Sequence, residues 1–125
     1  MKHLLDVSVL VALIWPSHTH HHAATDWAEG KSLVICPIVE LGFIRVSTSP
    51  AHNASMSDAR QALADFIKDE HPAFIAADLP VLSGAVAPTS RKTTDWYLAN
   101  LADAHGLRWA TLDVSAQHPN AEHVK

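Results

Sequence analysis

The sequence predicts an α/β domain with a central parallel sheet of four to five strands and helices on both faces. Short apolar runs of strand length alternate along the chain with longer segments of helical pattern. This alternation is typical of parallel sheets, because each crossover helix carries the chain back to the same end of the sheet. The 125 residues contain no linker or internal repeat. We therefore expect a single domain that spans residues 1–125.

Composition and charge exclude several classes of protein. No apolar run approaches the roughly 18 residues that a membrane span needs, and an acid interrupts the first apolar stretch too early for a signal peptide. Cys36 is the only cysteine, so no disulfide framework exists and a cytoplasmic protein is expected. The net charge of −4 is not the basic footprint of a protein that binds nucleic acid mainly through phosphates. A nucleic-acid substrate would need local basic residues and a metal.

The first half of the chain predicts two strands and three helices. Pro16 ends the first helix, Gly30 stands where a helix-terminating glycine belongs, and Pro37 opens the third helix. The third helix is apolar almost all round, which is typical of a buried helix. The expected strands are residues 2–6 and 33–36, and the expected helices are residues 8–15 (with Ser8 as candidate cap), 17–29 and 37–47.

The second half predicts two longer helices and further short strands. Ser57 is the expected cap of the fourth helix, which Pro72 ends, and Thr93 or Thr94 is the expected cap of the fifth, which Gly106 ends. The other expected elements are strands at residues 74–76 and 109–112, an edge strand at 123–124, a short apolar helix at 81–86 and a loop at 88–92.

Four of the 13 acids occupy positions that a simple solvated charge does not explain. Asp6 and Asp113 follow buried strands, Asp95 lies in the first turn of a helix, and Glu40 lies inside an apolar helix. Each also has a structural explanation. Asp6 and Asp113 would cap the following turn, Asp95 would complement the helix dipole, and Arg45 or another base would balance Glu40.

Taken together, the four acids predict a metal site. Strand ends and helix N-termini of a doubly wound sheet open on the same crevice, and Glu40 reaches it if its helix lines the wall. Carboxylates this close repel one another, so either some are protonated or a divalent cation lies among them. An all-oxygen set of ligands suits Mg²⁺ or Mn²⁺. Such an ion would activate water and stabilise a phosphodiester in its transition state.

Four segments in order resemble the successive motifs of PIN-domain ribonucleases, and in particular the VapC toxins of bacterial toxin–antitoxin systems. The resemblance extends over residues 1–113. The acid positions of the family match Asp6, Glu40, Asp95 and Asp113. The segments are residues 4–10, 36–45, 93–99 and 110–113.

The resemblance implies a Mg²⁺- or Mn²⁺-dependent endoribonuclease with a parallel sheet. It also implies a homodimer and a cognate antitoxin whose peptide covers the acidic site, often with a basic side chain. The hydroxyls of Ser8 and Thr94 would support the acids or contact substrate. Arg45, Arg91 and Lys92 are candidates either for contact with RNA phosphates or for packing against acids.

Two departures from the family pattern leave an alternative open. The family usually has Asn at the position of Ser8, and a basic residue often follows the acid at Asp113, where this chain has Val114-Ser115-Ala116. The alternative is a non-catalytic PIN-like module that binds RNA or protein. A response-regulator-like domain is disfavoured, because Asp6 has no acidic neighbour in the sequence.

Histidines and tryptophans offer two weaker signals. His18 and His22 would share a face of the second expected helix and could bind a transition metal, but an exposed polar face explains them more simply. The four tryptophans could stack on bases, although packing is the expected role for at least three of them. They are Trp15, Trp27, Trp96 and Trp109.

Overall fold

A five-stranded parallel sheet forms the centre of the protein. The computed structural model describes residues 2–125. The strand order is β3-β2-β1-β4-β5, and every neighbouring pair is parallel, as the sequence predicts. The strands are β1 (Lys2–Leu5), β2 (Ser32–Ile35), β3 (Ala73–Phe74), β4 (Arg108–Thr111) and β5 (Ala121–His123). The helices are α1 (Val7–Ile14), α2 (His21–Ala28), α3 (Pro37–Ser47), α4 (Met56–Glu70), the 3₁₀ turn η1 (Ser90–Lys92) and α5 (Thr93–Ala104).

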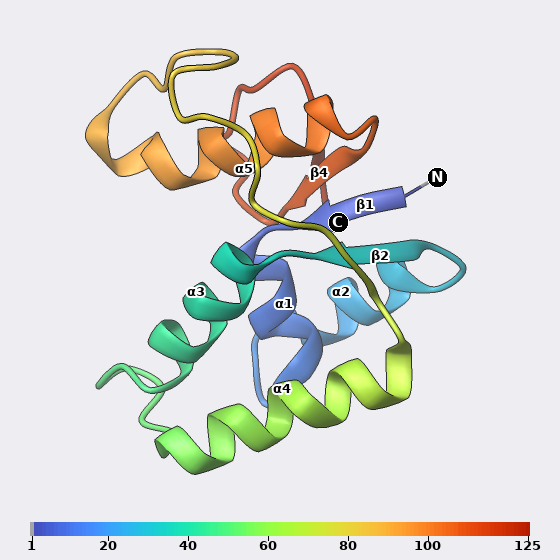
Figure 1. Ribbon diagram of the computed structural model, residues 1–125. Helices are drawn as coiled ribbons and strands as arrows, with labels where there is room; N and C mark the ends of the chain where they lie inside the picture. Colours follow the sequence, from blue (N-terminus) through green and yellow to red (C-terminus); the bar gives the residue numbers. More distant parts are fainter. Residues whose placement is uncertain (1) are drawn as a thin grey trace.

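Helices cover both faces of the sheet, which confirms the predicted architecture. Figure 1 shows α1, α2, α3 and α4 on one side of the sheet and α5 on the other. The central strand β1 is buried between these layers through Leu4 and Leu5, which are inaccessible to solvent. Trp109 of β4 is equally inaccessible. Within the described part of the chain, no helix is long and apolar enough to cross a membrane.

The order of the strands places a topological switch point at the carboxyl ends of β1 and β4. From β1 the chain moves outward through β2 to β3, then returns along α5 and builds β4 and β5 on the other side of β1. The two neighbours of β1 are therefore reached by connections that run in opposite directions. In open α/β sheets such a switch point is where ligands bind. Asp6 and Asp113 follow the two strands that form it.

Two predicted helix starts are wrong. The helix expected at residues 17–29 begins only at His21, because Ser17–His20 form turns after Pro16. His18 and His22 therefore do not share a helical face. The fourth helix is capped by Ser55 and not by Ser57, since the Ser55 hydroxyl accepts a hydrogen bond from the Asp58 N–H at 2.9 Å.

The helix predicted at residues 81–86 is absent, and turns and bends replace it. The Asn100 side chain holds this connection, because Nδ2 donates to the Ala85 carbonyl at 2.9 Å and Oδ1 accepts from the Ala85 N–H at 3.1 Å. Gly84 lies against Asn100 with a φ of +83°, where a Cβ would come within 2.6 Å of the amide. The apolar pattern of this segment predicts a helix because it does not include Asn100, which lies 15 residues away from Ala85 and hydrogen-bonds the backbone of the segment.

Two further predictions need correction. The third helix has the predicted bounds, Pro37–Ser47, but it is not buried all round, because Leu41 is 65% exposed. The edge strand expected at residues 123–124 is β5 and begins at Ala121.

The packing role predicted for the tryptophans is confirmed: Trp15 stacks on Phe43, Trp27 and Trp96 pack edge-on against His3 and His118, and Trp109 is fully buried.

Candidate functional site

Asp6 is a buried carboxylate at the end of the central strand. It is 5% exposed, and its Oδ1 accepts the Val7 N–H at 2.7 Å, which caps α1. Oδ2 accepts hydrogen bonds from the hydroxyls of Ser8 and Thr111, both at 2.8 Å. Burial raises the pKa of Asp6 above its ordinary value, although these three hydrogen bonds oppose the rise. The capping role considered for Asp6 is therefore real, and the same carboxylate lies at the switch point of the sheet.

Two hydroxyls connect the ends of β1 and β4. Thr111 is fully buried, and its Oγ1 accepts the Asp113 N–H at 3.1 Å while donating to Asp6. Ser8 is not the cap of α1; its Oγ donates to Asp6 and accepts the Leu112 N–H at 3.3 Å. The sequence interpretation missed Thr111. The signal available was a hydroxyl two residues before Asp113, which the two-residue repeat of a strand places on the same side.

Asp113 is held by Lys92 and Ser115. The Lys92 Nζ lies 2.5 Å from Oδ2, and Oδ1 accepts the N–H and the hydroxyl of Ser115 at 2.9 Å and 2.6 Å. Lys92 and then Ser115 lower the pKa of Asp113 to about 2. Asp113 is thus the most acidic of the predicted ligands. Ser115 was noted in the sequence only as a departure from the family, yet it fixes the orientation of this carboxylate.

Asp95 lies in the first turn of α5 and interacts electrostatically with the other two aspartates. Burial, together with the negative charges of Asp6 and Asp113, raises the pKa of Asp95 to about 6, while Lys92 opposes the rise. Asp113 likewise contributes to the raised pKa of Asp6. We call Asp6, Asp95 and Asp113 the acid site. It lies at the switch point, as the sequence predicts.

Glu40 has different surroundings from the three aspartates of the acid site. Burial raises the pKa of Glu40, and the aspartates make no resolved contribution to the shift. Its side chain lines a hollow of about 490 Å³ between α3 and α4, together with Leu41, Arg60 and Leu63. Among the ion pairs of residues 2–125, none involves Glu40, so the pairing with Arg45 considered above does not form.

The remaining candidates differ in their surroundings. Lys92 packs against an acid, while Arg45, Arg91 and Thr94 are exposed. Across residues 2–125, no three His, Cys, Asp or Glu side chains lie close enough to form a ready metal cage, and this includes the cluster at His18–His22. The ligand chemistry of the acid site nevertheless fits Mg²⁺ or Mn²⁺, because its donors are all carboxylate oxygens whose mutual repulsion a cation would relieve.

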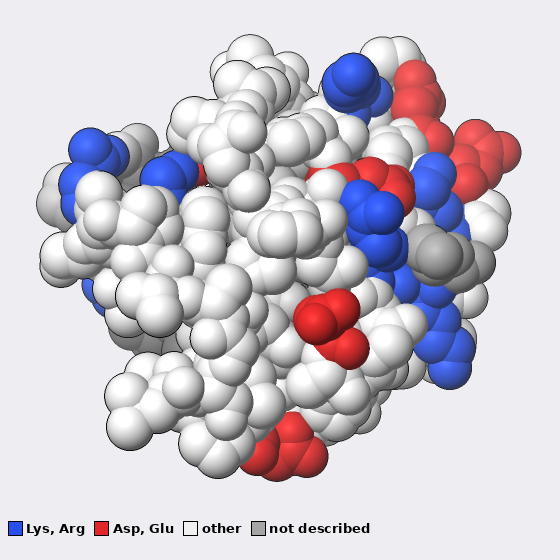
Figure 2. All heavy atoms as spheres, turned by 90° about the horizontal axis from the view of Figure 1, so that it is seen from above, with Lys and Arg blue, Asp and Glu red and all other residues white. Residues whose placement is uncertain are grey.

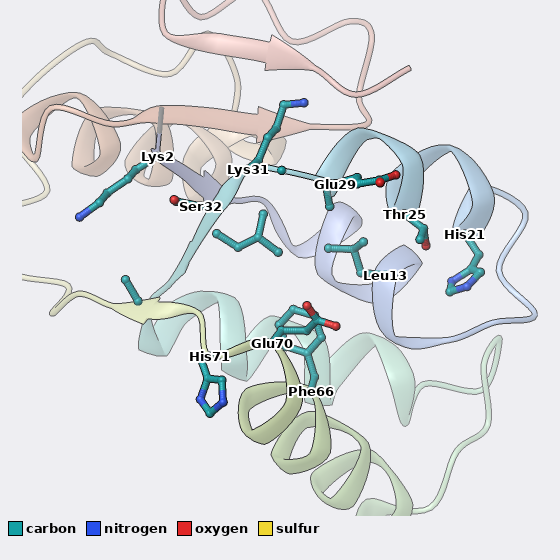
Figure 3. Close-up of a pocket in the computed structure, with 14 residues that line it drawn as sticks. Lys2, Leu13, His21, Thr25, Glu29, Lys31, Ser32, Phe66, Glu70 and His71 are labelled. Atoms are coloured by element: carbon teal, nitrogen blue, oxygen red, sulfur yellow. The ribbon is translucent and has the colours of Figure 1, made fainter.

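The largest hollow lies elsewhere. It measures about 860 Å³ and is lined by residues from the amino ends of β1 and β2 and from α2 and α4, as Figure 3 shows. Lys2 and Lys31 extend away from it in different directions, while Leu13 and Phe66 form part of its wall. Its polar groups do not converge on one point. We therefore place the chemistry at the acid site and not in the largest cavity.

The surface charge shows no broad basic face in the view of Figure 2. Lys and Arg side chains stand in separate groups toward two sides of this face, with largely uncharged surface between them. Asp and Glu side chains lie beside the larger group. This pattern agrees with the net charge of −4 and with the expectation that any nucleic acid is held locally.

Comparison with known families decides the classification. The family model described as "PIN domain" matches residues 3–120. The chain belongs to the PIN-domain family. This membership confirms the resemblance in the sequence and excludes the response-regulator-like alternative.

Relatives of this PIN domain are ribonucleases of one group. Ribonuclease VapC38 of Mycobacterium tuberculosis is 36% identical, over 88% of this chain and 84% of the relative. From the same organism, ribonuclease VapC39 is 33% identical over 92% and 91% of the two chains, and ribonuclease VapC44 is 34% identical over 92% and 88%. The chain is therefore similar to VapC ribonucleases over nearly their whole lengths.

A solved structure has the same fold. VapBC2 from Rickettsia felis, bound to a DNA fragment from their promoter, matches with a TM-score of 0.66 over 100% of both chains. The identity is 15%, so this likeness speaks for the fold alone.

Proposed function

We propose that this PIN domain is the toxin of a toxin–antitoxin pair and a Mg²⁺- or Mn²⁺-dependent endoribonuclease. The observation that carries the proposal is the acid site, in which three aspartates from distant parts of the chain lie close enough at the switch point of the sheet for Asp113 to raise the pKa of Asp6 and for both to raise the pKa of Asp95. The similarity to ribonucleases named VapC supports RNA as the substrate. Glu40 is included as the fourth acid because it matches an acid position of the family.

Asp6, Asp95 and Asp113 would hold the divalent ion, with Glu40 as the fourth acid. The ion, when bound, would supply activated water and neutralise charge on the phosphodiester. Thr111 and Ser8 orient Asp6 through fixed hydrogen bonds, so this carboxylate needs little rearrangement. Asp95 is largely ionised at neutral pH, because its pKa is about 6, and it is then available as a ligand.

The proposed partners are an antitoxin and a second copy of the chain. The structural neighbour is a VapBC assembly, which supports an antitoxin partner here. The acid site suits inhibition by a basic side chain of that partner, because it already accommodates the ammonium of Lys92. The homodimer stays a prediction from the family resemblance, and the cytoplasmic location stays a prediction from the single cysteine.

Cleavage of total RNA tests the proposal. The wild-type protein should cleave RNA with Mg²⁺ or Mn²⁺ and lose the activity in EDTA. Asp6→Asn and Asp95→Asn should each reduce the rate by roughly 100-fold or more, because losing a metal ligand should cost more than the roughly 10- to 100-fold that losing a partner of a ligand costs. Asp69→Asn, on the exposed face of α4, is the matched control and should cleave like the wild type. Full activity in both site variants would refute the assignment.

The non-catalytic alternative keeps one observation in its favour, the lack of a ready metal cage among residues 2–125. Calorimetric titration with Mg²⁺ separates the two functions. A nuclease should bind Mg²⁺ saturably and lose this binding in Asp6→Asn. A binding module should show RNA or protein binding that EDTA does not alter.

A further inference from the structure

Lys92 places a single ammonium group inside the acid site. It is the last residue of η1 and directly precedes α5, and its side chain is 24% exposed. Its Nζ contacts Asp113 Oδ2 at 2.5 Å and the Ser115 hydroxyl at 3.1 Å. The same charge acts on Asp95, which lies three residues further along the chain. Lys92 therefore interacts with two of the three aspartates.

This arrangement is specific to Lys92. Within residues 2–125, the Lys92–Asp113 contact is the only ion pair that a Lys or Arg side chain makes, since each of the other three ion pairs involves a histidine. Arg91, the preceding residue, carries the same charge and is exposed. The chain thus contains two adjacent cations, one of which is directed at the acid site.

We propose that Lys92 is the internal counter-ion of the acid site, and that a divalent cation must displace its ammonium from Asp113 in order to bind. This inference rests on the metal dependence of the proposed function. The ammonium and a divalent cation compete for the same carboxylate, and their positive charges repel at contact distance. Lys92 accordingly lowers the affinity for metal and offsets the repulsion among the carboxylates while no metal is bound.

The competition predicts a gain of metal affinity when the charge is removed. Calorimetry with Mg²⁺ alone should give at least tenfold tighter binding for Lys92→Gln than for the wild-type protein. Lys92→Arg keeps the charge and should stay within about threefold of the wild type. Arg91→Gln removes the same charge from the same turn and should change the affinity less than twofold, because Arg91 does not contact the acid site. Equal or weaker binding by Lys92→Gln would overturn the proposal.

The displacement itself is open to direct observation in the wild-type protein. NMR of isotope-labelled lysine side chains should show that the Lys92 Nζ and Cε signals move when Mg²⁺ saturates the protein. The signals of Lys68, which is exposed on α4, should stay in place. A Lys92 signal that is unchanged at saturating Mg²⁺ would overturn the displacement, and this measurement does not depend on how well the variants fold.

The outcomes also separate this inference from the proposed function. If wild type and Lys92→Gln bind Mg²⁺ with equal affinity, the counter-ion role fails and the metal-dependent function stands. If neither binds Mg²⁺, the metal dependence fails and the counter-ion role fails with it. If only Lys92→Gln binds measurably, the counter-ion role is supported, and the wild-type enzyme requires higher metal concentrations.

Discussion

Replacing Asp95 by Asn removes a negative charge from the acid site at nearly constant volume. The pKa of this carboxyl is about 6 in the folded protein, against an ordinary value of 3.8. At one pKa unit per 1.36 kcal/mol, ionised Asp95 costs the metal-free fold up to about 3 kcal/mol. Because Asp95 is only half-buried, we expect Asp95→Asn to raise the free energy of unfolding at pH 7 by about 1 to 3 kcal/mol.

The size of this effect depends on pH. Between pH 4 and pH 6 the folded protein binds more protons at Asp95 than the unfolded chain does, so the stability of the wild type falls as pH rises through that window. The difference between Asp95→Asn and wild type should therefore be large at pH 7 and small below pH 4. The variant that loses RNA cleavage should be the more stable protein when metal is absent.

Urea denaturation in EDTA at several pH values measures this difference. A gain of about 1 to 3 kcal/mol corresponds to several degrees in the melting temperature of a domain this size. Asp69→Asn, on the exposed surface of α4, should change the stability by no more than about 0.5 kcal/mol. If Asp95→Asn is no more stable than the wild type at pH 7, the cost inferred for ionised Asp95 from its burial and from the repulsion by Asp6 and Asp113 is wrong.

Two further predictions concern the hydrogen bonds made by the side chains of Thr111 and Asn100. Thr111→Val removes the hydroxyl that donates to Asp6 and accepts from Asp113, so unfolding in urea should become easier by about 1.5 to 3 kcal/mol, whereas Thr111→Ser should retain most of the stability. A Thr111→Val variant as stable as the wild type would mean that the hydroxyl does not hold the two strand ends. Asn100→Ala removes both hydrogen bonds to Ala85, so limited proteolysis within residues 79–89 should accelerate roughly tenfold, which corresponds to a loss of about 1.4 kcal/mol in the local free energy of opening. An unchanged cleavage rate would show that Asn100 does not hold this connection.

Local signals in the sequence predicted much of the fold. Pro37 fixed the start of α3, and the alternation of apolar runs gave the parallel sheet, because both features depend on neighbouring residues only. The segment at residues 81–86 was misjudged because its conformation depends on Asn100, which is distant in the sequence. The start of α2 was misjudged because the turns that follow Pro16 carry no distinctive residue.

In the candidate site too, features set by neighbouring residues are predictable from the sequence, and features set by distant residues are not. Asp6 and Asp113 are predictable because each lies within two residues of the end of a strand. Thr111 was not, since its hydrogen bond to Asp6 depends on the register between β1 and β4, in which Leu5 pairs with Ala110. Whether Lys92 faces an acid or solvent was equally undecidable from the sequence, because η1 sets its direction.

The parallel pairing of β1 with β4 has a consequence for synthesis of the protein. Asp6 is synthesised 105 residues before Thr111, which donates one of its hydrogen bonds, and also well before its charged neighbours Asp95 and Asp113. A nascent chain that has not yet reached β4 therefore contains Asp6 and Glu40 but lacks the strand that completes the acid site. If the proposed activity resides there, the ribosome that makes this protein meets no active product before β4 has been synthesised.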